Sequence, residues 1–310
     1  MRSVCGASGG VSTRASMLPS AVRRVAGVRE LSSNYDTLLL DQFGVLHDGR
    51  RAYPHALEAT RRLAEAGKRL IVLSNSGRRA AETLAKLEQL GFCGAWFSGA
   101  VTSGETTHAA LMARCDPLFA RLGRRCLHFD WAERGAVGLD PALGLEAVQR
   151  VEEAEFLLAH GVETCSGQAV SLQGVKELLE QAARQALPLI IANPDVVTVD
   201  TTALVPMPGQ LGLWYSAMAG AGEVVLMGKP SRCIYDAALA MGRPGRTLAV
   251  GDSLAHDIMG ALGAGVDSLF ISSGIHAGDL SPYSSAALER LASEHCSGGL
   301  PTFVAEHFEW

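Results

Sequence analysis

The chain has 310 residues, of which 48% are hydrophobic, and its formal net charge is −5. This much apolar sequence can bury a sizeable core in one or two domains, which argues against wholesale disorder. The acidic balance argues against a general nucleic-acid binder, because such proteins normally carry a basic stripe. No apolar run reaches the roughly 18–20 residues that cross a bilayer, so we expect no membrane partner.

The first 29 residues differ in composition from the rest of the chain. They contain five arginines and no acidic residue, which is typical of an organelle transit peptide. A disordered tail, or a true start at Met17, would explain the same composition. We therefore expect the protein in a chloroplast or mitochondrion if this segment is a transit peptide, and in the cytoplasm otherwise. The seven cysteines show no C-x-x-C spacing, which predicts reduced thiols rather than disulfides or a zinc site.

From about residue 30, short apolar strands alternate with helical stretches. The expected strands are 37–40, 70–73, 187–192, 224–227, 247–250 and 268–271, and the expected helices include 55–67, 79–90 and 231–241. This alternation predicts an α/β fold with a doubly wound, mostly parallel, Rossmann-like sheet and helices on both faces. The interval from Ser74 to Lys229 is far longer than a single crossover needs. We therefore expect an inserted domain at 105–205, with the core formed by 30–104 and 206–310.

Polar residues stand at the ends of several expected strands. Asp41, Ser74, Lys229 and Asp252 each follow an apolar strand-like run, directly or within two residues. In parallel sheets, sites form just beyond the carboxyl ends of the strands. We therefore expect these four residues to converge on one edge of the sheet.

Each strand-end segment also has a structural explanation. Asp41 can attack phosphorus or hold Mg²⁺, or it can simply cap the turn after its strand. Ser74 and Asn75 offer donors to an anion at a helix start, and equally they can cap that helix. Lys229, in Gly-Lys-Pro, suits a phosphate or clustered carboxylates, although most lysines are simply solvated.

The segment with Asp252 and Asp257 is the most specific of the four. Two carboxylates five residues apart in a loop after a strand can reach one metal ion from the same side. Acids this close repel each other unless a cation or hydrogen bonds neutralise them. The alternative is that both cap the following helix.

The ordered set of segments over about residues 34–275 resembles the haloacid dehalogenase superfamily. The large insertion, together with Ser-Asn-Ser at 74–76, Asn-Pro-Asp at 193–195 and Gly-Lys-Pro-Ser at 228–231, resembles its class IIA branch. That branch includes nucleotide, 4-nitrophenyl phosphate, phosphoglycolate and pyridoxal phosphate phosphatases. Each motif is short and unspecific by itself, whereas the ordered set is highly specific.

The resemblance implies that Asp41 is the nucleophile and forms an aspartyl-phosphate. It also implies a Mg²⁺ cofactor held by the carboxylates of Asp41 and Asp252 and by the backbone carbonyl of Phe43. Asp257 would complete or orient that site, and Lys229 would offset the crowded negative charge.

The resemblance further implies that Ser74 and Asn75 contact the transferred phosphoryl group. The inserted domain would be a cap that selects the substrate, and related caps often mediate a homodimer. Asn193 and Asp195 would lie near the active site, although Asn193-Pro194 is equally consistent with a plain turn.

Phe43 is the one departure from the motif pattern. Phosphatases of this group usually have an aspartate at that position, which protonates the leaving group and then activates water. General acid–base help is commonly worth about 10²–10⁴-fold, so its loss should lower activity on esters with poor leaving groups. His47 or Asp48 could substitute for the missing acid, although Asp48-Gly49 is also a plain turn signal.

The leading hypothesis is a phosphohydrolase acting on a small phosphorylated metabolite. The main rival is a non-catalytic or weakly active protein that binds a phospho-ligand. Phosphonate cleavage would need an imine-forming lysine, and only Lys176 lies in the expected cap; dehalogenation does not explain a metal-binding set. Sequence assigns no partner to four further residues, which we expect to be packing or surface residues: His108, His128, Trp131 and His160.

Overall fold

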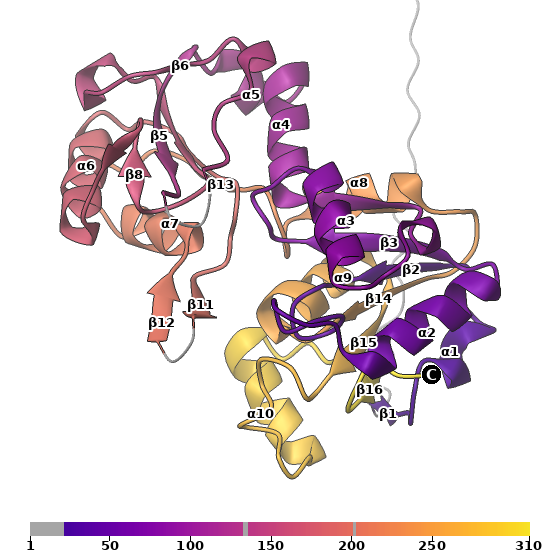
Figure 1. The fold of residues 1–310 in the computed structure, drawn as a ribbon. Helices are drawn as coiled ribbons and strands as arrows, with labels where there is room; N and C mark the ends of the chain where they lie inside the picture. The colour runs from indigo at the N-terminus through magenta and orange to yellow at the C-terminus, as the bar shows by residue number, and fades with distance from the viewer. Residues whose placement is uncertain (1–21, 133–135, 201–202) are drawn as a thin grey trace, which may run out of the picture.

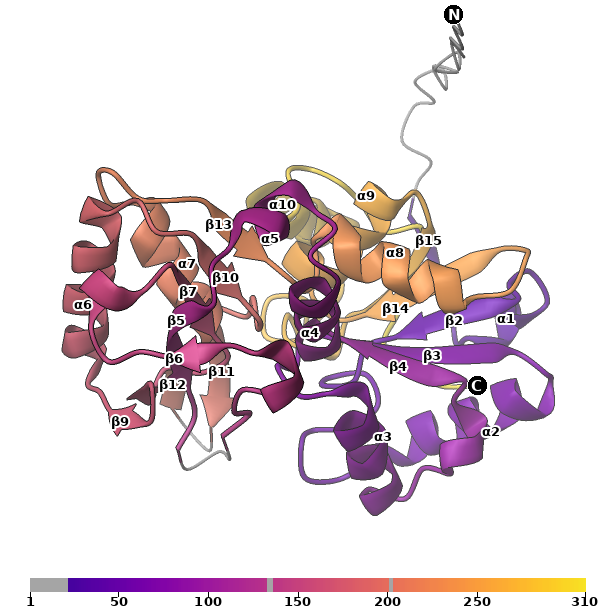
Figure 2. The same cartoon turned by 90° about the horizontal axis from the view of Figure 1, so that it is seen from above.

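The computed structural model describes residues 22–132, 136–200 and 203–310, and it contains two α/β units (Figures 1 and 2). The first unit is built on a parallel seven-stranded sheet. Its strands, in spatial order, are β1 (Arg23–Arg24), β16 (Phe303–Ala305), β15 (Asp267–Ile271), β14 (Thr247–Gly251), β2 (Thr37–Leu40), β3 (Arg69–Ser74) and β4 (Gly99–Thr102).

Both faces of this sheet are buried, because alternate side chains of each strand point to opposite faces. Leu38 and Leu40 pack in one apolar cluster and Leu39 packs in another. Helices α1 (Arg29–Ser32), α2 (Pro54–Glu65) and α3 (Ala80–Gln89) contribute to the first cluster, and α8 (Arg232–Met241) and α9 (Met259–Ala264) contribute to the second. Helix α10 (Ser285–His295) packs beside Phe270 of β15. Figure 2 shows α2 and α3 on one side of the sheet and α8 and α9 on the other, which confirms the predicted fold class.

The second unit has its own mixed sheet. In spatial order its strands are β13 (Val224–Leu226), β10 (Leu189–Ile191), β7 (Phe156–Ala159), β5 (Arg125–Asp130), β8 (Thr164–Cys165) and β9 (Gln168–Ala169), with β6 (Glu146–Ala147) pairing with β5. Helices α6 (Leu172–Arg184) and α7 (Pro208–Ser216) pack in one apolar cluster, while α4 (Ser103–Ala113) and α5 (Pro117–Arg121) pack in another. Single 3-10 turns cover 141–143 and 151–153 in this unit, and 94–96 in the first unit. The hairpin of β11 (Val197–Asp200) and β12 (Ala203–Pro206) projects beside this unit (Figure 1). We call this second unit the cap and the first unit the core.

The cap extends further along the chain than the boundary expected at residue 205. The expected strand at 224–227 forms β13, which pairs in parallel with β10 of the cap sheet. Leu211 and Tyr215 of α7 are completely buried in the cap cluster. The cap therefore includes the chain up to about residue 226, because α7 buries Leu211 and Tyr215 there and β13 pairs with the cap sheet.

The end of the expected N-terminal tail is also part of the core. β1 pairs with β16, and Val25 and Val28 are buried. Residues 22–29 are therefore folded, and the rest of the expected tail lies outside the described residues. The six cysteines within the described ranges are free thiols, as predicted. Among the helices of the described segments, none is both long and apolar enough to cross a membrane.

Candidate active site

Asp41 stands at the carboxyl edge of the core sheet, directly after β2. Its N–H donates to the Val250 carbonyl at 2.9 Å, which continues the pairing of β2 with β14. The chain then turns sharply, and the Gln42 carbonyl accepts the N–H groups of Val45, Leu46 and His47. The sheet therefore fixes the backbone of Asp41. Because the chain turns directly afterwards, the Asp41 side chain lies among the loops at this edge.

The Lys229 ammonium group joins two of the predicted carboxylates. Its Nζ donates to Oδ1 of Asp41 and to Oδ1 of Asp257, both at 2.7 Å. The Lys229 side chain is 3% exposed, and the Asp257 side chain is 5% exposed. The other carboxylate oxygen of Asp257 accepts the Ser253 N–H at 3.1 Å. The structure thus brings together three residues separated by up to 216 positions in one buried polar cluster.

Lys229 reaches this edge by a different route from the one expected. The strand before it, β13, belongs to the cap sheet, so Lys229 lies on the segment that returns from the cap to the core. The Lys229 N–H donates to Oδ1 of Asn75 at 2.7 Å, which attaches this segment to the loop after β3. A side chain at Gly228 would place its Cβ 2.5 Å from that same oxygen. The glycine before Lys229 is therefore required for close approach of the two segments.

Asp252 adds a third carboxylate, and one oxygen of each of Asp41, Asp252 and Asp257 lies within 4.8 Å of the others. Oδ2 of Asp252 accepts the Ile275 N–H at 2.8 Å. A Cβ at Gly44, where φ is +82°, would lie 1.9 Å from Oδ2 of Asp252, so the Phe43–Gly44 turn approaches this carboxylate directly.

The residues present fit a divalent magnesium ion. When its three carboxylates are ionised, the buried cluster carries two more negative charges than its one ammonium group neutralises. Mg²⁺ prefers oxygen ligands of this kind and usually needs only one or two protein carboxylates. Asp41 and Asp252 could supply carboxylate oxygens and Phe43 its carbonyl, with Asp257 already oriented by Lys229.

The pKa values of the cluster reflect burial and crowding. Burial raises the pKa of Asp41 to about 7, with Lys229 opposing this shift and Asp257 adding to it. Burial and the neighbouring charges of Asp41 and Asp257 also raise the pKa of Asp252 well above its usual value. Burial disfavours the charged form of Lys229, but Asp257 and Asp41 outweigh this effect, and the Lys229 pKa lies well above its ordinary value. Without a further cation the raised pKa values favour protonation of these carboxyl groups, and a bound cation would keep them ionised.

Ser74 and Asn75 lie at the same edge and have different roles. Oγ of Ser74 accepts the Ser76 N–H at 3.2 Å, and a hydroxyl that accepts one bond still has a proton to donate. The Asn75 side chain accepts from the Lys229 N–H and donates to Oδ1 of Asp195 at 2.8 Å. Its amide thus positions Lys229, so the expected phosphoryl contact from Asn75 would come from its backbone N–H.

Asn193 and Asp195 form the cap side of this junction. Oδ1 of Asn193 accepts the Asp195 N–H at 3.0 Å, which makes the turn that the sequence also allowed. Asp195 reaches the core through Asn75 and lies 3.6 Å from Nδ1 of His256. The contact with His256 is one that sequence reasoning missed.

The structure gives His47 and Asp48 local roles near Phe43. Oδ1 of Asp48 accepts the N–H groups of Arg50 and Arg51, and these backbone bonds lower its pKa, so it is an ionised turn residue. Nδ1 of His47 accepts the Gly49 N–H at 3.0 Å, and burial lowers the His47 pKa to about 4. The exposed Phe43 ring packs edge-on against His47. A charged carboxylate and a neutral imidazole are both poorly suited to protonating a leaving group near pH 7.

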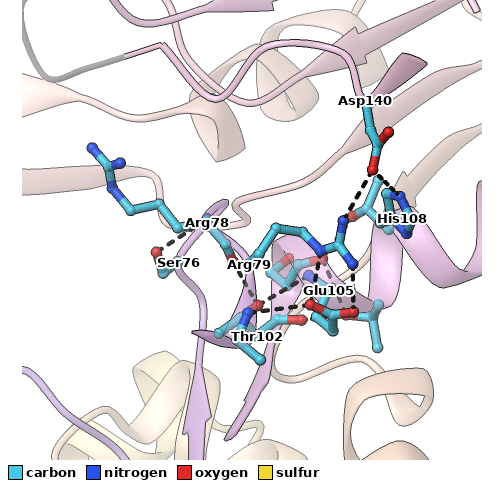
Figure 3. A network of polar contacts seen from close by, with 11 residues as sticks. Ser76, Arg78, Arg79, Thr102, Glu105, His108 and Asp140 are labelled. Carbon is cyan, nitrogen blue, oxygen red and sulfur yellow. Dashed lines mark hydrogen bonds and ion pairs between the residues drawn. The ribbon is translucent and has the colours of Figure 1, made fainter. Parts of the chain in front are cut away.

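Two further polar clusters, one between core and cap and one within the cap, had no signal in the sequence. Arg79 forms a two-pronged ion pair with Glu105 and reaches Asp140, which also pairs with Nε2 of His108 at 2.9 Å (Figure 3). Within the cap, Nε2 of His128 and Nδ1 of His160 lie 2.9 Å apart. The partners are 26 to 61 positions apart along the chain, so no local spacing could reveal them.

Comparison with known proteins agrees with this architecture. Residues 38–128 match the family described as haloacid dehalogenase-like hydrolase, and residues 226–296 match the one described as HAD-hydrolase-like. Glycerol-3-phosphate phosphatase of Gallus gallus is 31% identical, over 82% of this chain and 85% of that protein. Chronophin of Bos taurus is 30% identical, over 81% and 86%.

Solved structures give the same result. A haloacid dehalogenase-like hydrolase from Brucella suis aligns with a TM-score of 0.71 at 26% identity, covering 91% of this chain and 99% of that one. Glycerol phosphate phosphatase of Mycobacterium tuberculosis, in complex with magnesium, aligns with a TM-score of 0.62 at 25% identity, covering 89% and 77%.

The fold and the carboxylate–lysine cluster define a hydrolase with an α/β core and an inserted α/β cap. The chain belongs to the haloacid dehalogenase superfamily of hydrolases and has the cap arrangement of its class IIA branch.

Asp252→Asn tests the metal site directly. Removing one of the crowded carboxylates should weaken Mg²⁺ binding by at least about tenfold, which corresponds to about 1.4 kcal/mol, as measured by titration calorimetry. The same change should raise the melting temperature without Mg²⁺, because it relieves repulsion within the buried cluster. Asp236→Asn is the matched control, since Asp236 is exposed on α8 and pairs with Arg232. Unchanged Mg²⁺ affinity in Asp252→Asn would rule out this site.

Proposed function

We propose that this protein is a Mg²⁺-dependent phosphohydrolase that acts on a small phosphorylated metabolite through an aspartyl-phosphate at Asp41. The observation that supports this most strongly is the buried cluster in which Lys229 joins Asp41 and Asp257 beside Asp252. An ordinary strand-end cap needs neither a buried lysine nor two further carboxylates. Phosphoryl transfer needs both positioning and offset negative charge.

The cluster contains the groups that position and stabilise the first step, in which the phosphoryl group is transferred to Asp41. A carboxylate oxygen of Asp41 forms a bond to phosphorus while the bond from phosphorus to the ester oxygen breaks, and the leaving oxygen keeps the electron pair. Lys229 holds the Asp41 carboxylate in place, and the Ser74 hydroxyl would donate to a phosphoryl oxygen. Mg²⁺, when bound by Asp41, Asp252 and the Phe43 carbonyl, supplies positive charge that offsets the phosphoryl oxygens.

Proton transfer is the part of the reaction for which the site has no evident group. The Phe43 side chain can neither protonate the leaving oxygen nor take a proton from the water that attacks the aspartyl-phosphate. Esters whose leaving group is stable as an anion should react well, since they need little protonation. Hydrolysis of the aspartyl-phosphate should then be slow, and this intermediate should accumulate.

The replacement at position 43 also favours a second candidate function. A protein that retains the metal and phosphoryl sites without proton transfer would bind a phospho-ligand and turn it over weakly or not at all. Both candidates use the same cluster, so turnover decides between them.

We expect Mg²⁺-dependent hydrolysis of 4-nitrophenyl phosphate, with a rapid release of one nitrophenolate per protein molecule before a slower steady rate. Asp41→Asn should lower the steady rate by at least about a thousandfold, because it removes the nucleophile. Stopped-flow absorbance measures both phases, and chelation of Mg²⁺ should abolish them. If the protein binds Mg²⁺ and phosphate but releases no nitrophenolate above the Asp41→Asn level, the binding function is correct.

Phe43→Asp should restore the missing proton transfer. We expect its kcat/KM on an alkyl phosphate to increase at least about tenfold, and the increase on 4-nitrophenyl phosphate to be much smaller. Phe43→Leu is the control, because it reduces side-chain size without adding an acid. An equal gain in both variants would show that the Phe43 ring obstructs the site and that proton transfer is not what limits the rate.

A further inference from the structure

Two cavities lie at the seam between core and cap, and they adjoin because Gly77 and Val137 line both. The proximal cavity, of about 170 Å³, is lined by Ser76–Arg78 of the core and by Trp131, Asn193 and Met207 of the cap. The distal cavity, of about 220 Å³, is lined by residues of α4 and by Asp140 and His160.

The proximal cavity adjoins the loop that would contact a bound phosphoryl group, because Ser76 lines it. Ser76 follows directly on Ser74 and Asn75, and Asn193 lies on the cap segment that Asp195 joins to Asn75. A leaving group attached to phosphorus at Asp41 would therefore extend past Ser76 into this space.

The core wall of the two cavities is held firmly. Oγ1 of Thr102 donates to the Arg78 carbonyl at 2.6 Å and accepts the Glu105 N–H at 3.0 Å, so the start of α4 clamps the loop (Figure 3). The Gly104 N–H donates to the Ser76 carbonyl at 3.0 Å. A wall fixed in this way can discriminate between ligands by shape, because it cannot move aside at low cost.

Size and polarity favour a ring over a short polyol. An apolar cavity of about 150 Å³ is large enough to bind benzene, and each of these cavities is larger than that. Trp131, Val137 and Met207 give the proximal cavity an apolar wall. A three-carbon polyol would leave most of this space empty and would lose hydrogen bonds with water.

The charged side chains that line the distal cavity are already paired. The Arg79 guanidinium binds Glu105 with two hydrogen bonds and reaches Asp140, and Asp140 also contacts His108 (Figure 3). A charged group on the ligand would have to break these pairs. An uncharged ligand would leave them intact.

His160 offers a neutral hydrogen-bonding group at the junction. It lines the distal cavity, and its Cδ2 lies 3.6 Å from the position a Cβ at Gly77 would occupy. Its Nδ1 is paired with His128, which fixes the ring. Burial and the adjacent His128 lower the His160 pKa to about 3, so the imidazole is neutral near pH 7.

From these features we infer that the two cavities bind the leaving group, and that they select an uncharged, ring-bearing alcohol whose polar atom hydrogen-bonds to His160. The substrate class is thus an aryl phosphate whose leaving group carries no charge. It is preferred to the phosphate of a polyol or of a carboxylate-bearing alcohol. This inference rests on the proposed function in one respect, namely that the Asp41 site binds the phosphoryl group.

The test measures binding without turnover, using phosphonates that cannot be hydrolysed. Titration calorimetry with full-length protein and Mg²⁺ would compare benzylphosphonate, 4-hydroxybenzylphosphonate, 4-carboxybenzylphosphonate and 2,3-dihydroxypropylphosphonate. Benzylphosphonate should bind at least about tenfold more tightly than the dihydroxypropyl compound, given the apolar area of a ring. The 4-carboxy compound should bind at least about tenfold more weakly than benzylphosphonate, because its charge would have to break the ion pairs that line the distal cavity.

Two variants test the assigned residues. Val137→Trp should block the junction and reduce the preference for the benzyl over the dihydroxypropyl compound by at least about tenfold. His160→Phe should remove the preference for 4-hydroxybenzylphosphonate over benzylphosphonate, which we expect to be about 2–10-fold. His160→Gln should retain part of that preference if His160→Phe does not fold, and His55→Phe, on α2 of the core, is the control that should leave all ratios unchanged.

Equal affinities across the four phosphonates, or preferences that survive Val137→Trp, would overturn this inference even if 4-nitrophenyl phosphate is hydrolysed. Selective ring binding without any turnover would support it while rejecting the phosphohydrolase function. The inference about ring selection and the proposed phosphohydrolase function can therefore be rejected independently of each other.

Discussion

The buried ammonium group of Lys229 is the interaction on which the site depends. It joins Asp41, at the end of a core strand, to Asp257, in the turn before α9, although Lys229 itself lies on the chain returning from the cap. Removing one partner of a buried ion pair typically costs about 3–5 kcal/mol, because the other charge is left buried alone. One side chain thus orients the nucleophile and connects the returning segment to the core.

A second set of contacts relates the cap to this cluster. Asn75 holds the backbone of Lys229 and also reaches Asp195, so a single amide connects the loop after β3, the segment from the cap and the turn at Asn193. The position of the cap is thereby linked to the position of the lysine. Arg79 adds a second link through Asp140 on the other side of the seam. The cavities at the seam consequently have defined walls on both sides.

The core of the site could be predicted because its residues sit at strand ends. Parallel strands bring their carboxyl ends to one edge, so Asp41, Ser74 and Asp252 had to converge once the strands were identified. Lys229 was predicted for a reason that does not hold, since its strand belongs to the cap sheet. The pairs of His108 with Asp140 and of His128 with His160 depend on how distant segments pack. Such contacts leave no periodic pattern, and the extent of the cap was missed for the same reason.

The residue at position 43 and the cavities lead independently to the same kind of substrate. Without an acid at position 43, the leaving oxygen must carry its negative charge unaided, which favours alcohols that ionise easily. Phenols meet this condition and aliphatic polyols do not, since a phenolic hydroxyl has a pKa near 10. The apolar walls of Trp131 and Met207 favour rings on grounds of size and polarity alone. A phosphatase whose cavity selects a phenolic leaving group has little need of a general acid in the first step. A phenylalanine at position 43 is therefore compatible with phosphoryl transfer from such a substrate to Asp41, while hydrolysis of the aspartyl-phosphate remains the slow step.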